Sequence, residues 1–237
     1  MDKKLIIDCR MRSMEKEYLK SLGYNIIELN RQNHVYEEIS SHVDVFCVKI
    51  NNKIILEPCV YNEFMLDEKY IIKGKSYLKE KYPFDIAYNV CQIGQNVVHN
   101  FKYTDEKVLE IIQKEKLNMI NINQGYSNCS IAVIDSNSAI VTDKNIAEIL
   151  IKNKIDVLLI DDDLDIKLLK NNGEYSNMKG FIGGCITRLD DNVVIFGELS
   201  KIDRHGKIRK FIESRALKII EFRGMDVIDY GGILVLD

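Results

Sequence analysis

The sequence predicts an α/β fold, a five-bladed α/β propeller built from repeated ββαβ units. The first observation is a recurring pattern of a strand, a tight turn and a second strand, after which a helix leads into a third strand. A repeat at a near-regular interval indicates several copies of one supersecondary unit. The uninterrupted copies begin at Phe46, Val90, Asn128 and Gly184.

The second observation is that a fifth copy is divided between the chain ends. Gly231–Leu236 reads as its first strand and Lys4–Cys9 as its second. An open ring would expose an unpaired strand edge, which a strand from each end removes. We therefore expect one domain over residues 1–237, with helices outside and a central funnel. Its units cover residues 230–237 plus 4–29, 44–85, 86–122, 125–160 and 180–222.

Local patterns predict the elements in order. Met14–Leu22 has leucines on one side and a glycine after it, which indicates a helix, and Tyr24–Leu29 reads as a strand. Asn51 and Asn52 tolerate the positive φ of a tight hairpin turn. The stretch that follows is less regular, and we expect a short helix at Ser76–Glu80.

The later units repeat this order. Thr104 and Thr142 are the expected helix caps of the second and third units. The second unit pairs Ala87–Ile93 with Val97–Phe101 and ends in the strand Leu117–Ile122. The third turns at Asp135–Ser138 and ends in Ile155–Ile160. The fourth follows a polar excursion at 161–179 and comprises Cys185–Leu189, Val193–Gly197, a helix over 203–215 and a strand over 217–222.

Bulk composition excludes several classes of protein. Lys and Arg number 33 against 36 Asp and Glu, so a protein built mainly to hold nucleic acid is not expected. We find no apolar run of membrane-spanning length and no signal peptide, which predicts a cytoplasmic protein. The six cysteines include no Cys-x-x-Cys pair, so we expect free thiols and no zinc site.

Three short phrases give a family resemblance. Gly125–Cys129, Gly180–Gly184 and Asp226–Gly232 resemble an uncharacterised Firmicutes branch of the pentein superfamily, the fold of the guanidino-group-modifying enzymes. These enzymes include arginine and agmatine deiminases, amidinotransferases and dimethylargininase. The resemblance covers nearly the whole chain and implies the five-bladed propeller.

The resemblance also implies a chemistry. A cysteine thiolate attacks the guanidinium carbon, a histidine moves protons, and carboxylates hold the cation. The nucleophile of those enzymes lies in the C-terminal strand, just after a Gly-Gly turn. In this chain the matching positions are Leu234 and Val235, and no cysteine lies beyond Cys185. The usual guanidino hydrolase or transferase reaction is therefore not expected.

Cysteines fall at equivalent points in the first strands of four units, at Cys47, Cys91, Cys129 and Cys185. Such cysteines are expected mainly as small buried residues that fill a crowded position. Cys185 and Cys129 are the candidates for a relocated nucleophile, because each stands where a strand begins near the funnel mouth.

His42 and Asp44 alternate before the first hairpin, so an extended segment would point both the same way. They could form a proton-handling pair, and the resemblance implies that Asp44 contacts substrate. The alternative for His42 and Asp44 is a hydrogen-bonded pair on the surface. Lys49 stands where a second acidic residue would help to bind a cation. Asn89, Asn128, Asp229 and Tyr230 would line a polar funnel or satisfy backbone groups at strand starts.

Other polar clusters have simpler explanations. Asp161–Asp163 with Asp165 lacks the glycine and the distal glutamate of a calcium loop, so no metal is expected. We expect no cofactor either. The basic stretch 204–210 reads as a solvated face, and His34 and His99 show no evident partner.

The sequence leaves three functions open. The first is binding of a small polar or cationic metabolite in the funnel, with catalysis lost. The second is a scaffold for a protein or ribosomal partner, for which residues 204–210 would matter. The third is a hydrolase or deiminase that uses Cys185 or Cys129 as its nucleophile.

Overall fold

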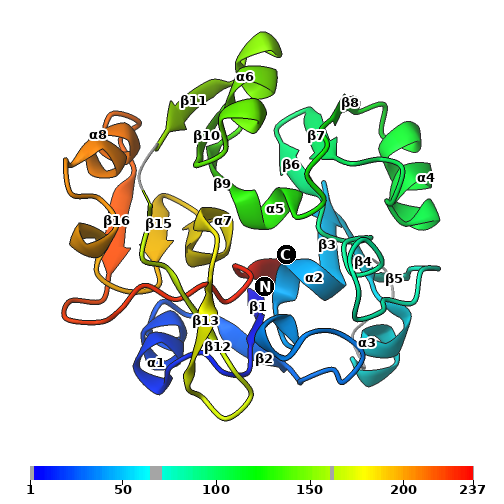
Figure 1. The fold of residues 1–237 in the computed structure, drawn as a ribbon, viewed down its shortest axis with the longest axis horizontal. Coiled ribbons are helices and arrows are strands. Elements are labelled where there is room, and N and C mark those ends of the chain that lie inside the picture. Colours follow the sequence, from blue (N-terminus) through cyan, green and yellow to red (C-terminus); the bar gives the residue numbers. More distant parts are fainter. Residues whose placement is uncertain (1–2, 65–70, 161–162, 237) are drawn as a thin grey trace.

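The computed structural model describes residues 3–64, 71–160 and 163–236. It shows a mixed α/β fold made of several small sheets (Figure 1). The α-helices of the described residues are α1 (Ser13–Ser21), α2 (Val43–Phe46), α3 (Pro58–Glu63), α4 (Glu106–Lys114), α5 (Ser127–Ser130), α6 (Lys144–Lys152), α7 (Ile182–Cys185) and α8 (Lys207–Glu213). The strands are β1 (Lys4–Asp8), β2 (Asn25–Leu29), β3 (Cys47–Ile50), β4 (Lys53–Leu56), β5 (Ile71–Lys73), β6 (Cys91–Ile93), β7 (Asn96–His99), β8 (Asn118–Asn121), β9 (Ile131–Asp135), β10 (Ser138–Val141), β11 (Asp156–Leu159), β12 (Lys167–Leu169), β13 (Tyr175–Lys179), β14 (Ile186–Leu189), β15 (Asn192–Ile195), β16 (Lys218–Glu221) and β17 (Leu234–Leu236).

Within the described residues, five sheets have three strands each and share one construction. Two strands pair antiparallel, and the middle strand pairs parallel with a third, which follows a helix in the chain. These sheets are grouped around the centre of the view in Figure 1, with α1, α3, α4, α6 and α8 at the periphery. They are separate in their hydrogen bonding, so the described strands do not form one circular sheet.

The two chain ends meet in one sheet, as the sequence predicts. β1 pairs antiparallel with β17, with Lys4 opposite Leu236, and pairs parallel with β2. β17 begins at Leu234, later than the expected Gly231. Gly231 and Gly232 have φ of 67° and 69°, a left-handed conformation that glycine adopts readily and that cannot continue a strand.

The hairpin turns lie where the sequence predicts them. Asn51, between β3 and β4, and Asp190, between β14 and β15, both have φ of 52°. Asn and Asp tolerate this left-handed conformation better than most residues do.

The predicted helix caps are wrong by one residue. Asp105, not Thr104, caps α4, because its carboxylate accepts hydrogen bonds from the backbone N–H groups of residues 107 and 108. Asp143, not Thr142, caps α6 in the same way. Thr104 instead places its hydroxyl 2.6 Å from Nδ1 of His99.

The segment predicted as a short helix at Ser76–Glu80 has no helix. The backbone N–H groups of Lys75 and Ser76 both donate to the Asp105 carboxylate, at 2.9 and 2.7 Å. These bonds hold the chain in a loop, while the helix and third strand of this unit are α3 and β5.

The polar excursion before the fourth unit forms a two-stranded hairpin, β12 and β13. Figure 1 shows this hairpin extending toward α1 and the loop that precedes α2. It contacts that loop through hydrogen bonds from Ser176 to Glu38 and from Ser40 to Asn171, each 2.8 Å. Asp161 and Asp162 of the rejected metal cluster lie outside the described residues.

Near the centre, three four-residue helices lie where the sequence predicts extended segments at the starts of strands. Residues 43–46, 127–130 and 182–185 form α2, α5 and α7, each directly before the first strand of a sheet. His42 and Asp44 therefore do not alternate along one extended segment: His42 occupies the N-cap position of α2 without a side-chain capping bond, and Asp44 lies inside the helix. Likewise, Cys129 and Cys185 belong to α5 and α7 and not to the first strands.

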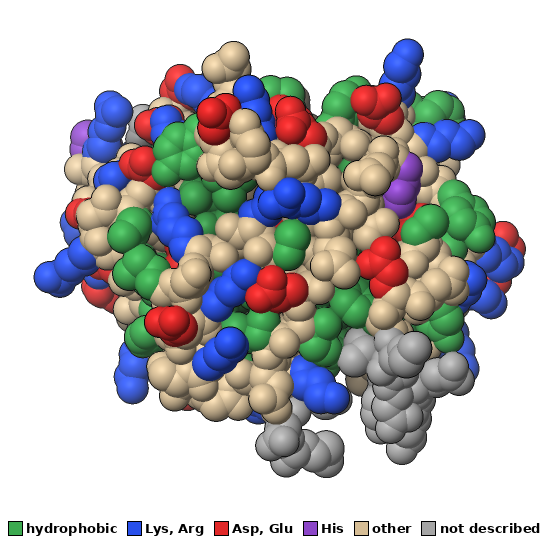
Figure 2. Space-filling view, turned by 90° about the horizontal axis from the view of Figure 1, so that it is seen from below, with side chains coloured by type: hydrophobic (Ala, Val, Ile, Leu, Met, Phe, Trp, Pro, Cys, Tyr) green, Lys and Arg blue, Asp and Glu red, His purple; other side chains and the backbone are tan. Residues whose placement is uncertain are grey.

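Apolar residues of the strands pack against one another and against the outer helices. A typical group joins Val97 of β7 and Ile55 of β4 to Ile112 of α4, all fully buried. On the surface, Figure 2 shows basic and acidic side chains interspersed over the face drawn. Among the described helices, none is both long and apolar enough to cross a bilayer.

Candidate functional site

A central cavity of about 410 Å³ is bounded by one strand from each three-stranded sheet. These are β3, β6, β9, β14 and β17, the first strand of each unit. The wall includes Lys49 of β3, Gln92 of β6, Asp135 of β9, Arg188 of β14 and Val235 of β17. The predicted central funnel thus has a counterpart in a cavity of small-molecule size.

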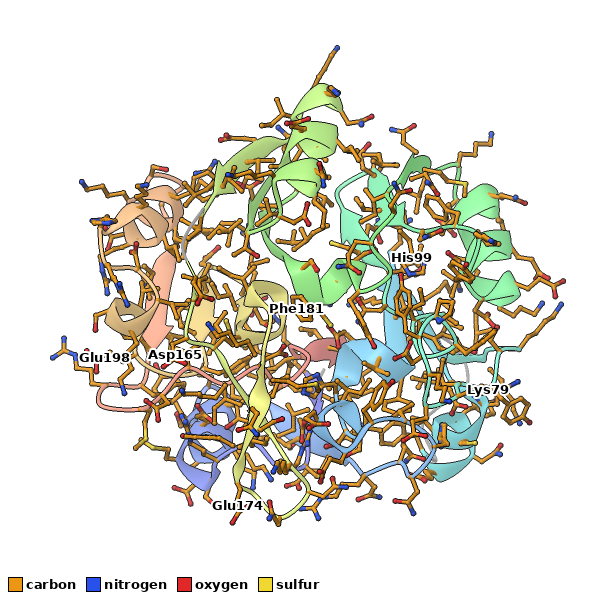
Figure 3. The ribbon with its side chains drawn as sticks, viewed as in Figure 1. Lys79, His99, Asp165, Glu174, Phe181 and Glu198 are labelled. Atoms are coloured by element: carbon orange, nitrogen blue, oxygen red, sulfur yellow. The ribbon has the colours of Figure 1, made fainter. Side chains whose placement is uncertain are left out.

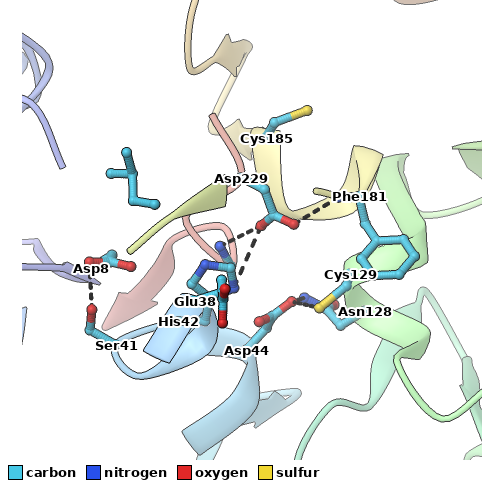
Figure 4. Close-up of polar contacts among 12 residues, drawn as sticks. Asp8, Glu38, Ser41, His42, Asp44, Asn128, Cys129, Phe181, Cys185 and Asp229 are labelled. Carbon is cyan, nitrogen blue, oxygen red and sulfur yellow. Dashed lines mark hydrogen bonds and ion pairs between the residues drawn. The ribbon is translucent and has the colours of Figure 1, made fainter. Parts of the chain in front are cut away.

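The inner end of the cavity is formed by the segments that precede these strands. It includes Asp44 of α2, Asn128 of α5, Gly183 of α7 and the turn at Gly231. Asp44 is 4% exposed. The Cys129 thiol donates to its Oδ2 at 2.9 Å, and Asn128 Nδ2 lies 3.4 Å from the same oxygen (Figure 4).

Asn89 orients this group from the preceding unit. Its side-chain carbonyl accepts hydrogen bonds from the backbone N–H groups of Asn128 and Cys129, at 2.8 and 3.2 Å. Its amide group donates to the Asp44 carbonyl at 3.1 Å and to the Cys129 sulfur at 3.0 Å. The fully buried Asn89 therefore fixes both the thiol and the helix that carries the carboxylate.

Asp229 approaches from the C-terminal segment. Its carboxylate accepts hydrogen bonds from the backbone N–H groups of Phe181 and Gly231, both at 2.8 Å. His42 Nδ1 lies 3.7 Å from its Oδ1. Only a glycine fits beside it, because a Cβ at Gly184 would stand 1.7 Å from that same oxygen. Asp229 lies behind the cavity wall and does not line the cavity itself.

Burial shifts the proton affinity of both carboxyl groups. Removal from water raises the pKa of Asp44 above its usual value. Burial and then the neighbouring Asp44 charge raise the pKa of Asp229 to about 7. Asp229 is therefore partly protonated at neutral pH, and a cation nearby would favour its ionised form.

His42 is the second unusual group. Burial, and then the charge of Arg10, lower its pKa well below the usual value, so its ring is neutral. Among the described residues, neither of its ring nitrogens has a hydrogen-bond partner, and the same holds for Oδ1 of Asp44. Buried polar atoms are normally hydrogen-bonded, so these atoms mark where a ligand or water would be held.

Neither candidate thiol is activated. Burial and then the charge of Asp44 raise the pKa of Cys129 well above its usual value. Burial and Asp229 do the same for Cys185. The Cys185 thiol lies 3.3 Å from the Ile182 carbonyl, and in Figure 4 its sulfur points away from Asp229. Of the two thiols, only Cys129 is hydrogen-bonded to a carboxylate of the site.

The structure thus brings together Asp44, Asn89, Asn128 and Cys129, and it places His42 against Asp229. Tyr230, which was expected in the funnel, instead donates to the buried Glu15 at 2.9 Å. Lys49 donates to the Val235 carbonyl at 2.9 Å on the cavity wall.

Sequence reasoning missed four neighbours of the site, Asp8, Arg10, Ser41 and Phe181. Arg10 and Asp8 form a buried ion pair of 2.7 Å, and Ser41 donates to Asp8 at 2.7 Å just before His42. Phe181, near the centre of Figure 3, stacks on Tyr126 with ring centroids 6.1 Å apart. The signal that could have found them was position, because Asp8 is the last residue of β1 and Phe181 directly precedes α7.

His99, which showed no evident partner in the sequence, has two in the structure. His99 lies 3.0 Å from the Gly125 carbonyl through Nε2, in addition to its Thr104 contact. Burial lowers its pKa to about 4, which makes it a neutral core residue. In the basic stretch 204–210, Arg209 is paired with Glu221 at 2.6 Å and with Glu213 at 3.6 Å.

Solved structures define the class to which this fold belongs. The chain resembles a mutant of dimethylarginine dimethylaminohydrolase from Pseudomonas aeruginosa complexed with citrulline, with a TM-score of 0.54 and 11% identity over 95% of this chain and 92% of that chain. Inosamine-phosphate amidinotransferase from Streptomyces griseus has a TM-score of 0.58 and 10% identity over 93% and 77%. Agmatine deiminase from C. jejuni has a TM-score of 0.53 and 12% identity over 94% and 75%. The protein therefore has the pentein type of fold.

The particular family follows from the sequence. Residues 6–234 match the Family of unknown function (DUF6873), and the chain belongs to that family. No curated protein matches it.

Proposed function

We propose that the protein binds a small cationic metabolite, of guanidino or amidino type, at the inner end of the central cavity. The observation that carries the proposal is the convergence of Asp44 and Asp229, two buried acidic groups, with His42: among the described residues, Oδ1 of Asp44 and both ring nitrogens of His42 have no hydrogen-bond partner. Asp44 offers a buried carboxylate oxygen to the cavity, and Asp229 and neutral His42 lie behind it. A planar cation with several N–H donors complements such acceptors.

The architecture proposed for this site is a propeller of five blades closed by the terminal strands. Its support is the shared construction of the three-stranded sheets and the pairing of β1 with β17. That each sheet contributes its first strand to one cavity wall is also what such a propeller requires.

We propose further that the reaction of the enzymes with this fold is lost. The positions where the resemblance implies a nucleophile are Leu234 and Val235, and β17 carries no thiol. Cys129 and Cys185 are buried, and their raised pKa values keep them as thiols at neutral pH. The bound cation is therefore retained and not modified.

Ligand-dependent thermal unfolding tests the binding proposal. Agmatine and arginine should raise the midpoint, since a ligand held only by the folded protein stabilises it. Citrulline, whose ureido group is uncharged, should raise it much less. Asp44→Asn should abolish the agmatine shift, whereas Asp190→Asn, at an exposed aspartate paired with Lys3, should keep it. Equal shifts in both variants, or none in the unaltered protein, would contradict the proposal.

One contact favours a second candidate function, a hydrolase with Cys129 as nucleophile. The 2.9 Å contact between its sulfur and Asp44 places a thiol at the proposed cation site. A guanidinium beside Asp44 would offset the carboxylate charge and lower the pKa of Cys129. The thiolate would then add to the guanidinium carbon, an amine would leave with a proton, and water would release the product and regenerate the thiol.

Alkylation by chloroacetamidine, an electrophile with a cationic amidine head, separates the two candidates. A hydrolase should gain one adduct at Cys129, protected by agmatine and absent in Cys129→Ser. The binding proposal predicts no adduct at this residue under native conditions. Cys185→Ser is the control, because its loss should not change labelling of Cys129.

A further inference from the structure

The loop after β2 and the start of α3 place three metal-ligating side chains together. His34, Glu57 and Cys59 each present one donor atom, and these atoms lie within 4.8 Å of one another. Glu57 and Cys59 belong to the unit of β3, β4 and β5, and His34 to the loop that leads into it. In Figure 1, α3 lies at the edge of the molecule. None of the three lines the central cavity.

Glu57 is the strongest indication of a ligand. It is fully buried, and its Oε2 caps α3 by accepting from the backbone N–H groups of Cys59 and Val60, at 2.7 and 3.1 Å. Its Oε1 has no hydrogen-bond partner among the described residues. A buried carboxylate oxygen without a partner is costly, and a cation would satisfy it.

His34 presents its ring to that same oxygen. Its Nε2 is also without a hydrogen-bond partner among the described residues and lies 3.7 Å from Glu57 Oε1, too far for a hydrogen bond. An edge-to-face contact with Phe46, with ring centroids 5.8 Å apart, orients the imidazole. The gap between the two atoms fits an ion that contacts both better than it fits a direct bond.

We infer that His34, Glu57 and Cys59 form a transition-metal site that prefers zinc. One imidazole nitrogen, one carboxylate oxygen and one sulfur match the ligands of zinc, which lie about 2.0–2.3 Å from the ion. His34 and Cys59 are partly exposed, which leaves their side chains room to rotate toward an ion held by Glu57. Solvent supplies the fourth ligand.

The expectation of no zinc site rested on the missing Cys-x-x-Cys pair. That criterion does not apply to a site assembled from one histidine, one glutamate and one cysteine of two different segments. Bound zinc would join the loop after β2 to α3 and so fasten the outer part of this unit.

Cobalt substitution tests the inference on the full chain, purified without a histidine tag and stripped of metal. Co²⁺ should produce a thiolate-to-cobalt charge-transfer band and the intense visible bands of a tetrahedral ion, and Zn²⁺ should displace it. His34→Gln and Cys59→Ser should weaken zinc binding by more than about 100-fold, since even outer-shell substitutions cost about 10–100-fold. Glu57→Gln, which keeps an acceptor for the helix cap, should weaken it as well.

Matched variants decide the outcome. Cys9→Ser and His205→Gln alter one partly exposed cysteine and one exposed histidine elsewhere, and both should leave the cobalt spectrum unchanged. Zinc should raise the unfolding midpoint of these two controls but not of Cys59→Ser. A spectrum lost only in Cys129→Ser would place the metal in the central site and overturn the inference. Absence of tight binding to the unaltered chain would overturn it too.

Discussion

Single buried residues control the charge of the central site. Asp229 binds its proton more tightly in the folded chain, where its pKa is raised to about 7, than in the unfolded chain. Its contribution to stability is therefore complete below about pH 4 and is lost as pH rises through about 7. His42, whose pKa is lowered, contributes in the opposite direction, because its stability is lost as pH falls.

Asp229→Asn should isolate this effect. The variant loses one backbone hydrogen bond at every pH, because an amide oxygen replaces only one of two carboxylate acceptors. As pH rises from about 4 to about 7, the free energy of unfolding of the variant should increase relative to that of the unaltered protein, by an amount on the order of 4 kcal/mol. Urea unfolding at a series of pH values measures this gain. Asp190→Asn, at an exposed carboxylate with a lowered pKa, should show no gain in that range, and a flat difference for Asp229→Asn would refute the assignment.

Much of the site could be predicted from the sequence, for a physical reason. Asp44, Asn89, Asn128 and Cys129 stand at comparable places before the first strands of their units, and those strands bound one cavity. The repeat therefore predicts that these four residues lie close together at the cavity. The zinc ligands could not be predicted in this way, because His34 and Glu57 meet through tertiary packing that no local pattern records.

At the scale of elements, the strand pairs of the repeated units and the long helices were predictable, whereas the hairpin β12–β13 and the shortest helices were not. Asn51 and Asp190 identify hairpin turns because few residues tolerate positive φ. Four residues are too few to show helical periodicity, so α2, α5 and α7 left no signal. The caps were missed because Thr and Asp adjoin at both sites, and either residue type caps a helix.

Asp105 should matter more than an ordinary cap. It bonds the backbone at the start of α4 and also the loop at Lys75 and Ser76. Asp105→Ala should cost about 3 kcal/mol, from a cap of about 1 kcal/mol and two further hydrogen bonds of about 1 kcal/mol each. Asp143→Ala, which removes a single cap bond, should cost about 1 kcal/mol. Urea unfolding compares the two, and equal losses would show that the loop bonds contribute nothing.

At the scale of the whole molecule, the meeting of the chain ends predicts tolerance of rearrangement. Because Lys4 and Leu236 are paired in one sheet, a short glycine-serine linker can join the ends without strain. A circular permutant with new ends at the exposed turn between Asn172 and Gly173 should fold and unfold cooperatively. Circular dichroism and thermal unfolding measure this.

The matched control for the permutant is a truncated chain, which removes the pairing of β1 with β17 and leaves the N-terminus in place. A chain that stops at Gly232 lacks β17 and exposes the edge of β1, so it should aggregate. Size-exclusion chromatography distinguishes the two variants. A monodisperse truncated chain would mean that β17 adds little to the fold.

The wall of the central cavity has a consequence for how occupancy would be detected. It draws on five short segments spread along the chain between Val43 and Val235, so parts of the polypeptide that are distant in sequence border one compartment. A bound molecule would slow amide hydrogen exchange in β3, β6, β9, β14 and β17 together, although these strands share no sheet. Mass spectrometry of exchange would thus detect a ligand as simultaneous protection of distant peptides, even before its chemical identity is established.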